Sequence, residues 1–497
     1  MIWSVVVPLA GGLAALLAPR RAARIAILTS VATLAVALAL TRAVALDGAL
    51  EHRPGGWPPP LGIRLVVDGV GVLFLLLVAL VFVAATVYGA SFFDPVETDR
   101  IDTGREAYDA EASDHAVRKG PRAPEGFWAL WLFALASLDG LFLTADLFNM
   151  YVAIELLTLA SVGLVAITND RASVTAALRY LLAGMVASLF FLLGISLLYA
   201  EYGVLDLEAL ATAISAATDP ASATGVALPL ILTGLAVKAA LFPFHFWLPP
   251  AHGSAFSPVS AVLSGLVVKG PFFVLLRLVT GPFAPVVPEA AGLALGALAV
   301  VGILWGSVRA LQQPRLKLLI AYSTVAQIGY LFLALGLAIS DPAGPAVRGG
   351  VVYALAHGCA KASMFLALGA IVRSTGHDRI RRLIAPQRGA PIAVSAFAVA
   401  GLAIMGFPPS GGFVGKLLIG EAATGADQWW TLAGLIVGGL LAALYLFRVF
   451  RRVFVAVPDD TAPLPRAPLG LEVPALALAV VSLLLGLAAA LPLGLVS

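Results

Sequence analysis

Five ionisable residues lie inside long apolar stretches of the sequence: Glu155, Lys238, Lys269, Lys361 and Lys416. An ionised group at membrane depth costs at least about 2.5–3.5 kcal/mol on insertion scales, so each of them needs water, a partner or a function. Burial disfavours the charged form of a lysine and a nearby carboxylate restores it, so such a set can exchange protons. A single buried lysine would equally suit a static ion pair that fixes helix packing. Several such residues in one chain favour transport of protons or other small cations.

Three histidines accompany these residues. His357 precedes Lys361 by four positions, which places both side chains on one helix face about one turn apart and suits a relay step. His245 and His252 lie close to the end of an apolar stretch. For these two, a role in proton access or gating and simple solvation by water or lipid headgroups both stay open.

Two apolar stretches are interrupted beside a lysine. Proline removes a helical hydrogen bond, and the freed backbone groups are tolerable at membrane depth only where they face protein or a watery cavity. Paired breaks in corresponding segments are typical of transporters with inverted repeats and an ion site at the repeat interface. Prolines that merely kink two helices for packing are the alternative. The breaks are formed by Pro243, Pro249 and Pro250 after Lys238, and by Pro408, Pro409, Gly411 and Gly412 before Lys416.

The elements that must hold these groups are membrane helices. Of the 497 residues, 60% are hydrophobic and only 12% are charged, and the mean hydropathy is +0.98, which is beyond the range of an ordinary soluble domain. Apolar runs of roughly 20 residues, the length that crosses the hydrocarbon core as a helix, recur throughout. We therefore predict an all-α, polytopic membrane protein with about fourteen transmembrane helices, over 2–18, 25–46, 66–93, 126–144, 147–168, 174–200, 226–249, 256–279, 289–310, 318–339, 349–373, 391–424, 429–449 and 471–494.

The charges of the loops predict the orientation of the chain. Alternate loops are basic and face the cytoplasm by the positive-inside rule; they include 20–24, 309–317, 373–388 and 448–452. The intervening loops carry acidic residues such as Glu51, Asp139 and Asp206. An even number of spans then places both termini on the outer side of the cell inner (cytoplasmic) membrane. The polar segment 94–125 falls on the cytoplasmic side, as a solvated linker or as a segment bound to a partner.

Several classes of function find no support in the sequence. Cys359 is the only cysteine, which excludes internal disulfides and argues against a cysteine-based metal centre. We find no nucleotide-binding loop, no nucleophile with an attendant base and no cluster of metal ligands, so we expect neither an enzyme nor a cofactor. The formal net charge is only +3 and the arginines lie between spans, which gives nucleic-acid binding no support.

Five longer motifs contain the residues described above: DLFNMYVAIELLTLAS, KAALFPFHFWLPPAHGSAFSPVSAVLSGLVVKG, LKLLIAYSTVAQIGY, YALAHGCAKASMFLALGAI and GFPPSGGFVGKLL. Together they resemble the antiporter-like subunit superfamily. This superfamily comprises the large membrane subunits of complex I, of membrane-bound hydrogenases and of Mrp-type multisubunit Na+/H+ antiporters. The motif DLFN before Glu155 and the segment GGWPPPLGIRLVVDG before the third span most resemble the D-type subunits of Mrp antiporters.

The resemblance implies a specific arrangement of the spans. It implies fourteen helices, in two inverted five-helix repeats with broken helices 7 and 12. The divisions would be three N-terminal helices over 1–93, the polar loop over 94–125, a first repeat over 126–280, a second repeat over 289–453 and a C-terminal helix over 471–494.

The resemblance also implies a role for each ionisable residue in a row along the membrane. Glu155 and Lys238 would form the ion pair of the first half, and Lys269 would connect the two halves. The middle of the row would be His357 and Lys361, and its terminal residue would be Lys416.

Three functions follow from this resemblance. The first is a proton-translocating component of a multisubunit Na+/H+ antiporter, similar to the Mrp D-type subunits. The second is a proton-pumping membrane subunit of a redox complex, either an NADH-quinone oxidoreductase or an energy-converting hydrogenase. The third is a non-transporting scaffold, or a membrane partner that energises uptake of a small carbon substrate. The expected partners are other membrane subunits, the lipid bilayer and protons, with Na+ as a further candidate. A row of lysines suits protons better than a cation that needs oxygen ligands.

Overall fold

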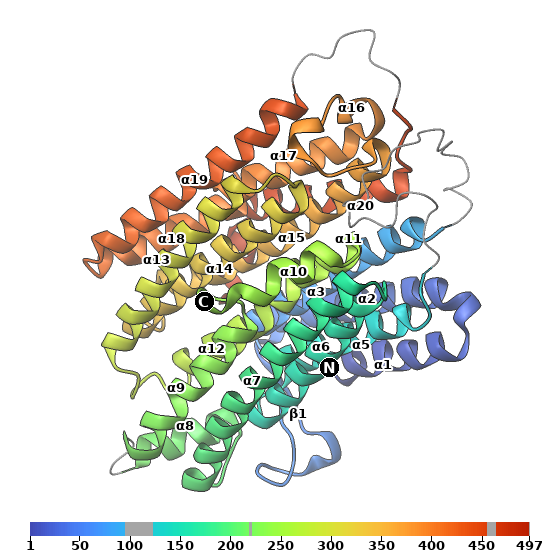
Figure 1. Cartoon of the computed structure of the whole chain (residues 1–497). Coiled ribbons are helices and arrows are strands. Elements are labelled where there is room, and N and C mark those ends of the chain that lie inside the picture. The colour runs from blue at the N-terminus through green and yellow to red at the C-terminus, as the bar shows by residue number, and fades with distance from the viewer. Residues whose placement is uncertain (95–122, 218–220, 455–463, 497) are drawn as a thin grey trace.

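The computed structural model of the chain describes residues 1–94, 123–217, 221–454 and 464–496. The predicted polar loop over 94–125 lies outside these residues except at its two ends. Helices make up most of the described chain, which confirms the predicted all-α class. Figure 1 shows them side by side and mostly aligned with one another.

The first half of the chain begins with helices that are separated by one short hairpin and by tight turns. Their bounds are α1 (Ile2–Leu17), α2 (Ala22–Asp47), β1 (Leu50–His52), β2 (Leu65–Val67), α3 (Gly69–Phe92), α5 (Phe127–Leu143), α6 (Leu147–Ala166), α7 (Arg171–Tyr202), α8 (Leu207–Ala216), α9 (Ala221–Lys238), α10 (Leu248–Ser254), α11 (Ser257–Val262) and α12 (Lys269–Thr280). The strands β1 and β2 pair antiparallel, with Leu50 opposite Val67.

The second half repeats the pattern of long helices and short turns. Its helices are α13 (Glu289–Gln312), α14 (Leu316–Ser340), α15 (Pro345–Thr375), α16 (Pro386–Gly389), α17 (Pro391–Met405), α18 (Gly411–Gly425), α19 (Trp429–Val453), α20 (Leu469–Leu487) and α21 (Ala490–Val496).

The helices account for the predicted number of spans. Ten segments of the described residues are long and apolar enough to cross a membrane. Four further traverses are made by the shorter apolar helices α1 and α5 and by two broken pairs, α9 with α10 and α17 with α18. Over the part of the chain that the structure describes, this gives the fourteen spans that the sequence predicted.

Aspartates begin several of these helices. Asp68 caps α3, Asp146 caps α6 and Asp206 caps α8, each accepting hydrogen bonds from backbone N–H groups of the first turn. Asp170 and Ser173 form a reciprocal capping box at the start of α7. The first N–H groups of a helix have no partner within the helix, so these side chains satisfy them where a span begins.

Asp139 is a correction to the predicted loop charges. The structure places it inside α5, four residues before the helix ends, with only 1% of its surface exposed. The turn from α5 to α6 contains only residues 144–146. An acidic residue near the end of a predicted span was therefore assigned to a loop that is too short to include it.

Three spans form the interior of the bundle. The apolar length of α11 with α12 is entirely buried, as is that of α15, and that of α14 is nearly so, whereas only about a third of α2 is buried. α14 packs against α13 and α15, and α15 packs against α11, α17, α18 and α20. Side chains on these inner helices are therefore separated from lipid by a ring of outer helices.

Both predicted helix breaks are present. α9 ends at Lys238, and the chain passes through a short 3-10 turn, Phe244–Trp247, before α10 begins. The indole N–H of Trp247 donates to the carbonyl of Val237 at 2.9 Å, which satisfies one backbone group that the break frees. The twelfth span is interrupted between α17 and α18, and Gly406 there has a φ of +83°, a conformation that glycine adopts without strain.

A third irregularity was not predicted. A π-helical turn, Leu263–Val267, joins α11 to α12 and ends two positions before Lys269. Such turns hold one residue more than an α-helical turn and occur often at functional sites.

Candidate proton-transfer site

The ion pair of the first half joins α6 to the end of α9. The Nζ atom of Lys238 lies 2.8 Å from Oε1 of Glu155 and also donates to the hydroxyl of Thr158 at 3.1 Å. The hydroxyl of Ser188, on α7, donates to the same carboxylate. The side chain of Lys238 is 4% exposed and that of Glu155 is 27% exposed. The lysine is therefore enclosed, while its carboxylate partner remains partly accessible from outside this chain.

Lys269 is completely buried at the start of α12. Its ammonium donates to the backbone carbonyl of Ser264 in the preceding π-helical turn. The hydroxyl of Ser264 in turn hydrogen-bonds to the hydroxyl of Thr324, on α14, at 2.7 Å. Although α9 packs against α12, no hydrogen bond or ion pair joins Lys238 to Lys269 among the described residues.

Polar groups of α14 continue the row into the second half. They recur every three or four positions, which places them along one face of the helix. Lys361 donates to the carbonyl of Ile320 at 3.1 Å and to the hydroxyl of Ser323. Ser323 and Thr324 are adjacent, so Lys361 and Ser264, whose carbonyl accepts from Lys269, contact the same turn of α14. The face comprises Ile320, Ser323, Thr324, Gln327 and Tyr330.

His357 and Lys361 both lie on α15, four positions apart, and both are buried. The imidazole of His357 stacks on the ring of Tyr353, with 5.8 Å between ring centroids and 3° between ring planes. The hydroxyl of Tyr353 donates to Oε1 of Gln327. The histidine is thus placed between the lysine and an aromatic group that contacts α14.

Lys416 ends the row beside the second helix break. Its Nζ atom donates to the carbonyls of Ile404 at 3.0 Å and Met405 at 3.2 Å, at the end of α17. The same atom lies 4.2 Å from the centroid of the Tyr330 ring. The row therefore extends from α6 through the inner helices to α18, and α14 supplies contacts along it.

The remaining two histidines differ in burial. His245 is half-buried and stacks on Phe242. His252 is fully buried and stacks on Phe365, and neither ring nitrogen has a hydrogen-bond partner among the described residues. The interpretation that headgroups or surrounding water solvate His252 at a span end is therefore wrong, because helix packing encloses it.

Several polar groups of the row were missed by sequence reasoning. Lys317 was assigned to a basic loop, but it is 1% exposed and donates to the carbonyl of Ala255 at 2.7 Å. All five lysines that the structure describes are thus buried. For the uncharged polar groups on α14, the signal that could have identified them is the spacing of polar residues in LKLLIAYSTVAQIGY. That motif contains Ser323, Thr324, Gln327 and Tyr330. Tyr353 on α15 and Tyr445 on α19 lie outside it and were missed as well.

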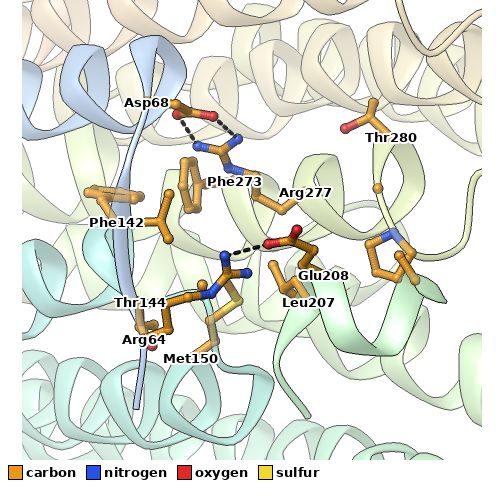
Figure 2. Close-up of a pocket in the computed structure, with 15 residues that line it drawn as sticks. Arg64, Asp68, Phe142, Thr144, Met150, Leu207, Glu208, Phe273, Arg277 and Thr280 are labelled. Atoms are coloured by element: carbon orange, nitrogen blue, oxygen red, sulfur yellow. Dashed lines mark hydrogen bonds and ion pairs between the residues drawn. The ribbon is translucent and has the colours of Figure 1, made fainter. Parts of the chain in front are cut away.

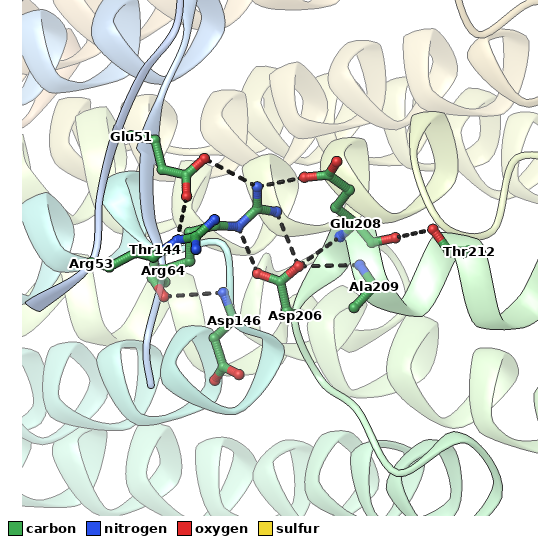
Figure 3. A network of polar contacts seen from close by, with 9 residues as sticks. All are labelled: Glu51, Arg53, Arg64, Thr144, Asp146, Asp206, Glu208, Ala209 and Thr212. Atoms are coloured by element: carbon green, nitrogen blue, oxygen red, sulfur yellow. Dashed lines mark hydrogen bonds and ion pairs between the residues drawn. The ribbon is translucent and has the colours of Figure 1, made fainter. Parts of the chain in front are cut away.

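A separate polar network covers the end of the bundle at which α3 and α6 begin. Arg64, next to β2, bonds to Asp206 at 2.9 and 3.0 Å and also pairs with Glu208 (Figure 3). These contacts join the β1–β2 hairpin to α8. Burial raises the pKa of Asp146 nearby; the N–H of Asn149 opposes this shift, and the charge of Asp206 adds to it.

A pocket of about 350 Å³ adjoins this network (Figure 2). Its lining includes Arg64, Glu208 and the pair formed by Asp68 and Arg277. Burial by itself would raise the pKa of Asp68, but the hydrogen bonds and charge of Arg277, with the N–H of Gly71, outweigh burial and lower it. Arg277 lies in the last turn of the helix that Lys269 begins, so the pair connects that helix to the start of α3.

The chain matches known membrane proteins over most of its length. Residues 144–442 match the family described as NADH:quinone oxidoreductase/Mrp antiporter, TM. A protein of Desulforudis audaxviator named NADH-quinone oxidoreductase subunit N is 35% identical over 84% of this chain and 78% of the relative. A protein of Bacillus subtilis, named as the D subunit of a Na(+)/H(+) antiporter, is 27% identical over 87% of this chain and 82% of the relative.

A solved structure matches the whole fold. A chain in the structure of the Mrp complex from Dietzia sp. DQ12-45-1b superimposes with a TM-score of 0.86 at 26% identity. The match covers 100% of the present chain and 96% of that chain.

Proposed function

The chain belongs to the NADH:quinone oxidoreductase/Mrp antiporter transmembrane family, and from this premise we propose that it is the proton-translocating, D-type component of a multisubunit Na+/H+ antiporter. The observation that carries the proposal is the row of buried lysines that begins at the Glu155–Lys238 pair and ends at Lys416. Each lysine lies within or beside an inner helix, where permanent burial of charge without a function would be costly.

The proposed mechanism is an electrostatic relay. Lys238 moves between Glu155 and Lys269, and its position changes the proton affinity of both. The disturbance then passes to Lys361 and Lys416. Two unit charges 4 Å apart interact by about 4 kcal/mol at an effective dielectric constant of 20, enough to change a proton affinity by a few pH units. Coupling between Lys269 and Lys361 is supported by their link through one turn of α14: Lys361 bonds the Ser323 hydroxyl, and Ser264, which accepts from Lys269, bonds the adjacent Thr324 hydroxyl.

We propose that protons pass through this chain and that Na+ is the counter-ion of the whole assembly. Other membrane subunits are the partners, because the structural relative is part of the Mrp complex. We assign no chemical reaction to this chain. The multi-pass chain lies in the cell inner membrane with both termini outside, and the two five-helix repeats cover 126–280 and 289–453.

The second candidate is a proton-pumping subunit of a redox complex. The 35% identity to an NADH-quinone oxidoreductase subunit N favours it, whereas the TM-score of 0.86 to a chain of the Mrp complex, against 0.75 to a chain of respiratory complex I from Thermus thermophilus, favours the antiporter. Purification of the native assembly and identification of its subunits separates them. Quinone-module and iron–sulfur subunits would accompany this chain only in a redox complex. A scaffold role is disfavoured because the residues of the row are all present.

The transport proposal is tested with Lys238→Ala in the native assembly reconstituted into proteoliposomes. We expect proton movement, followed with a pH-sensitive dye, to be abolished while the subunits remain together in gel filtration. Arg171→Ala is the matched control, because it removes a positive charge from the exposed start of α7. Proton movement at the wild-type rate in an assembled Lys238→Ala complex would contradict the relay.

A further inference from the structure

The two lysines at the helix breaks have different partners. Lys238 is paired with a carboxylate at 2.8 Å. For Lys416, 6% exposed, no carboxylate lies within ion-pair distance among the described residues. Its ammonium instead contacts two backbone carbonyls and lies 4.2 Å from the ring centroid of Tyr330 and 5.8 Å from that of Tyr353. The charge at the end of the row is therefore balanced by aromatic faces and by carbonyls at a helix C-terminus, both of which are partially negative.

The two rings are fixed from three helices. Their centroids are 5.5 Å apart, with an angle of 49° between the planes. The hydroxyl of Tyr330 donates to the carbonyl of Leu435 at 3.4 Å, and that of Tyr353 donates to Gln327. The amide nitrogen of Gln327 donates to the hydroxyl of Tyr445 at 3.4 Å. Gln327 thus joins α14 to α15 and α19, and it orients Tyr353 without touching Lys416 itself.

Two glycines leave the space that this arrangement needs. A Cβ atom on Gly406 would lie 2.9 Å from Cδ of Lys416, and a Cβ atom on Gly438 would overlap the hydroxyl of Tyr330. The backbones of the helix break and of α19 therefore approach the lysine and the ring too closely for any other residue to fit without a shift.

We propose that Tyr330 and Tyr353 form an aromatic cation site that takes the place of a carboxylate for charged Lys416, and that Gln327 positions Tyr353 within it. The inference rests on the proposed transport function and extends it. A carboxylate can accept the proton of a neighbouring lysine, whereas the face of an aromatic ring cannot. Lys416 therefore exchanges its proton only with water or with groups further along the row, and its charge is held without being neutralised.

Removal of the ring face tests the site. In the reconstituted assembly, Tyr330→Leu should lower proton transport about tenfold, the effect of losing a desolvated cation–π contact. Its pH profile should move to lower pH, because the charged form of Lys416 loses stabilisation. Tyr330→Phe should rescue both the rate and the profile, since it restores the ring. Tyr322→Leu is the matched control on α14, because that ring contacts Arg309 at 5.3 Å instead.

The pH readout depends on the titratable groups that surround Lys416. α14 contributes Tyr330, α15 contributes Tyr353, His357 and Lys361, and α19 contributes Tyr445. α17 carries no titratable side chain. On α20 the carboxylate of Glu472 is engaged by the N–H of Ala393 at 2.8 Å. A wild-type rate and pH profile in Tyr330→Leu would overturn the proposal.

A double-mutant cycle on stability separates this inference from the transport function. Thermal unfolding is measured for Lys416→Met, Tyr330→Leu and the double variant. If the ring holds the ammonium, Tyr330→Leu costs less stability when Lys416 is already absent. Additive effects of the two substitutions on stability would overturn the aromatic site, even if the wild-type assembly transports protons. Coupled effects, together with a wild-type assembly that moves no protons, would overturn only the proposed function.

A second variant tests the site if the Tyr330→Leu complex does not assemble. Gln327→Leu removes the acceptor of the Tyr353 hydroxyl but no contact of Lys416. We expect the pH profile to shift in the same direction by a smaller amount. Transport should fall roughly threefold, which corresponds to about half the free energy lost when the ring is removed. An unchanged profile in an assembled Gln327→Leu complex would contradict the positioning role.

Discussion

At the scale of single residues, the Glu155–Lys238 pair illustrates the difference between a balanced and an unbalanced buried charge. Lysine with its carboxylate 2.8 Å away is tolerable in a nonpolar environment, whereas lysine alone leaves an uncompensated charge. Removing either member therefore changes more than one contact, because the survivor must change its protonation, its position or its hydration.

Glu155→Gln is expected to lower proton transport by about a hundredfold or more, the order contributed by a positioned proton-transfer group. The amide can still hydrogen-bond to Lys238 but carries no charge. The measurement is the initial rate of dye-detected proton uptake in proteoliposomes. Glu289→Gln is the control, since it makes the same change in an exposed carboxylate at the start of α13; a similar loss there would show that the effect does not depend on the buried pair.

The Asp68–Arg277 pair predicts a pH dependence of stability. The pKa of Asp68 is below its ordinary value of 3.8, so its stabilising contribution is complete above that value and is lost as pH falls through the lowered value. Asp68→Asn keeps an acceptor for the helix cap but loses the charge. Its thermal unfolding temperature should be slightly lower than wild type at neutral pH, corresponding to at most about 1 kcal/mol for a partly exposed pair. The difference in unfolding temperature between wild type and Asp68→Asn should become smaller in acid. A difference that grew in acid would contradict the stabilising role of the Asp68 charge.

Sequence reasoning identified the lysines of the row because a cation in an apolar run is rare. It missed the hydroxyl and phenol groups that connect them, because polar uncharged residues are common in membrane helices and only their contacts reveal a shared face. It also missed Lys317, since a lysine near a span end is expected to reach the surface, whereas this one turns inward to the carbonyl of Ala255.

At the scale of elements, the helix breaks were predictable and the π-helical turn was not. Proline has a fixed effect on a helix wherever it occurs. The turn at Leu263–Val267 contains no proline, so none of its residue types predicts an irregular helix there. The hairpin was also beyond prediction, because strands of three residues have too little pattern to recognise.

Gly406→Ala tests how strictly the second break is shaped. A non-glycine residue at its φ of +83° costs about 1–2 kcal/mol, and the new Cβ atom would meet Lys416 as well. We expect a lower unfolding temperature and a reduced transport rate. Gly425→Ala, where an added Cβ atom meets nothing within 4 Å, is the control. An unfolding temperature equal to wild type in Gly406→Ala would contradict this account.

At the scale of the whole molecule, the number of spans followed from hydropathy but their placement did not. Among the ten long apolar spans of the described residues, α3 is the most apolar and α15 the least, yet α15 is the more deeply buried of the two. Lipid solvates apolar surface as well as protein does, so hydropathy does not drive a helix to the interior. Placement instead follows packing and the satisfaction of polar groups, which depend on contacts between distant segments.

The predicted orientation can be tested with single cysteines, because the native Cys359 is buried. Ala18→Cys lies beside the first basic loop and Gly48→Cys lies at the opposite end of α2. In intact cells, a membrane-impermeant maleimide should label position 48 and not position 18, and permeabilisation should expose position 18. The reverse pattern would place the termini inside.

The burial of all five described lysines has a consequence for how charge is distributed. Arginine keeps its proton under nearly all conditions, whereas lysine can release one when its surroundings change. Within the described residues, the outer cations of the Lys and Arg set are arginines, so their contribution to the surface potential is constant. The cations that can release a proton are confined to the interior, so a proton gained or lost there changes the charge inside the bundle without changing the charge of the outer arginines.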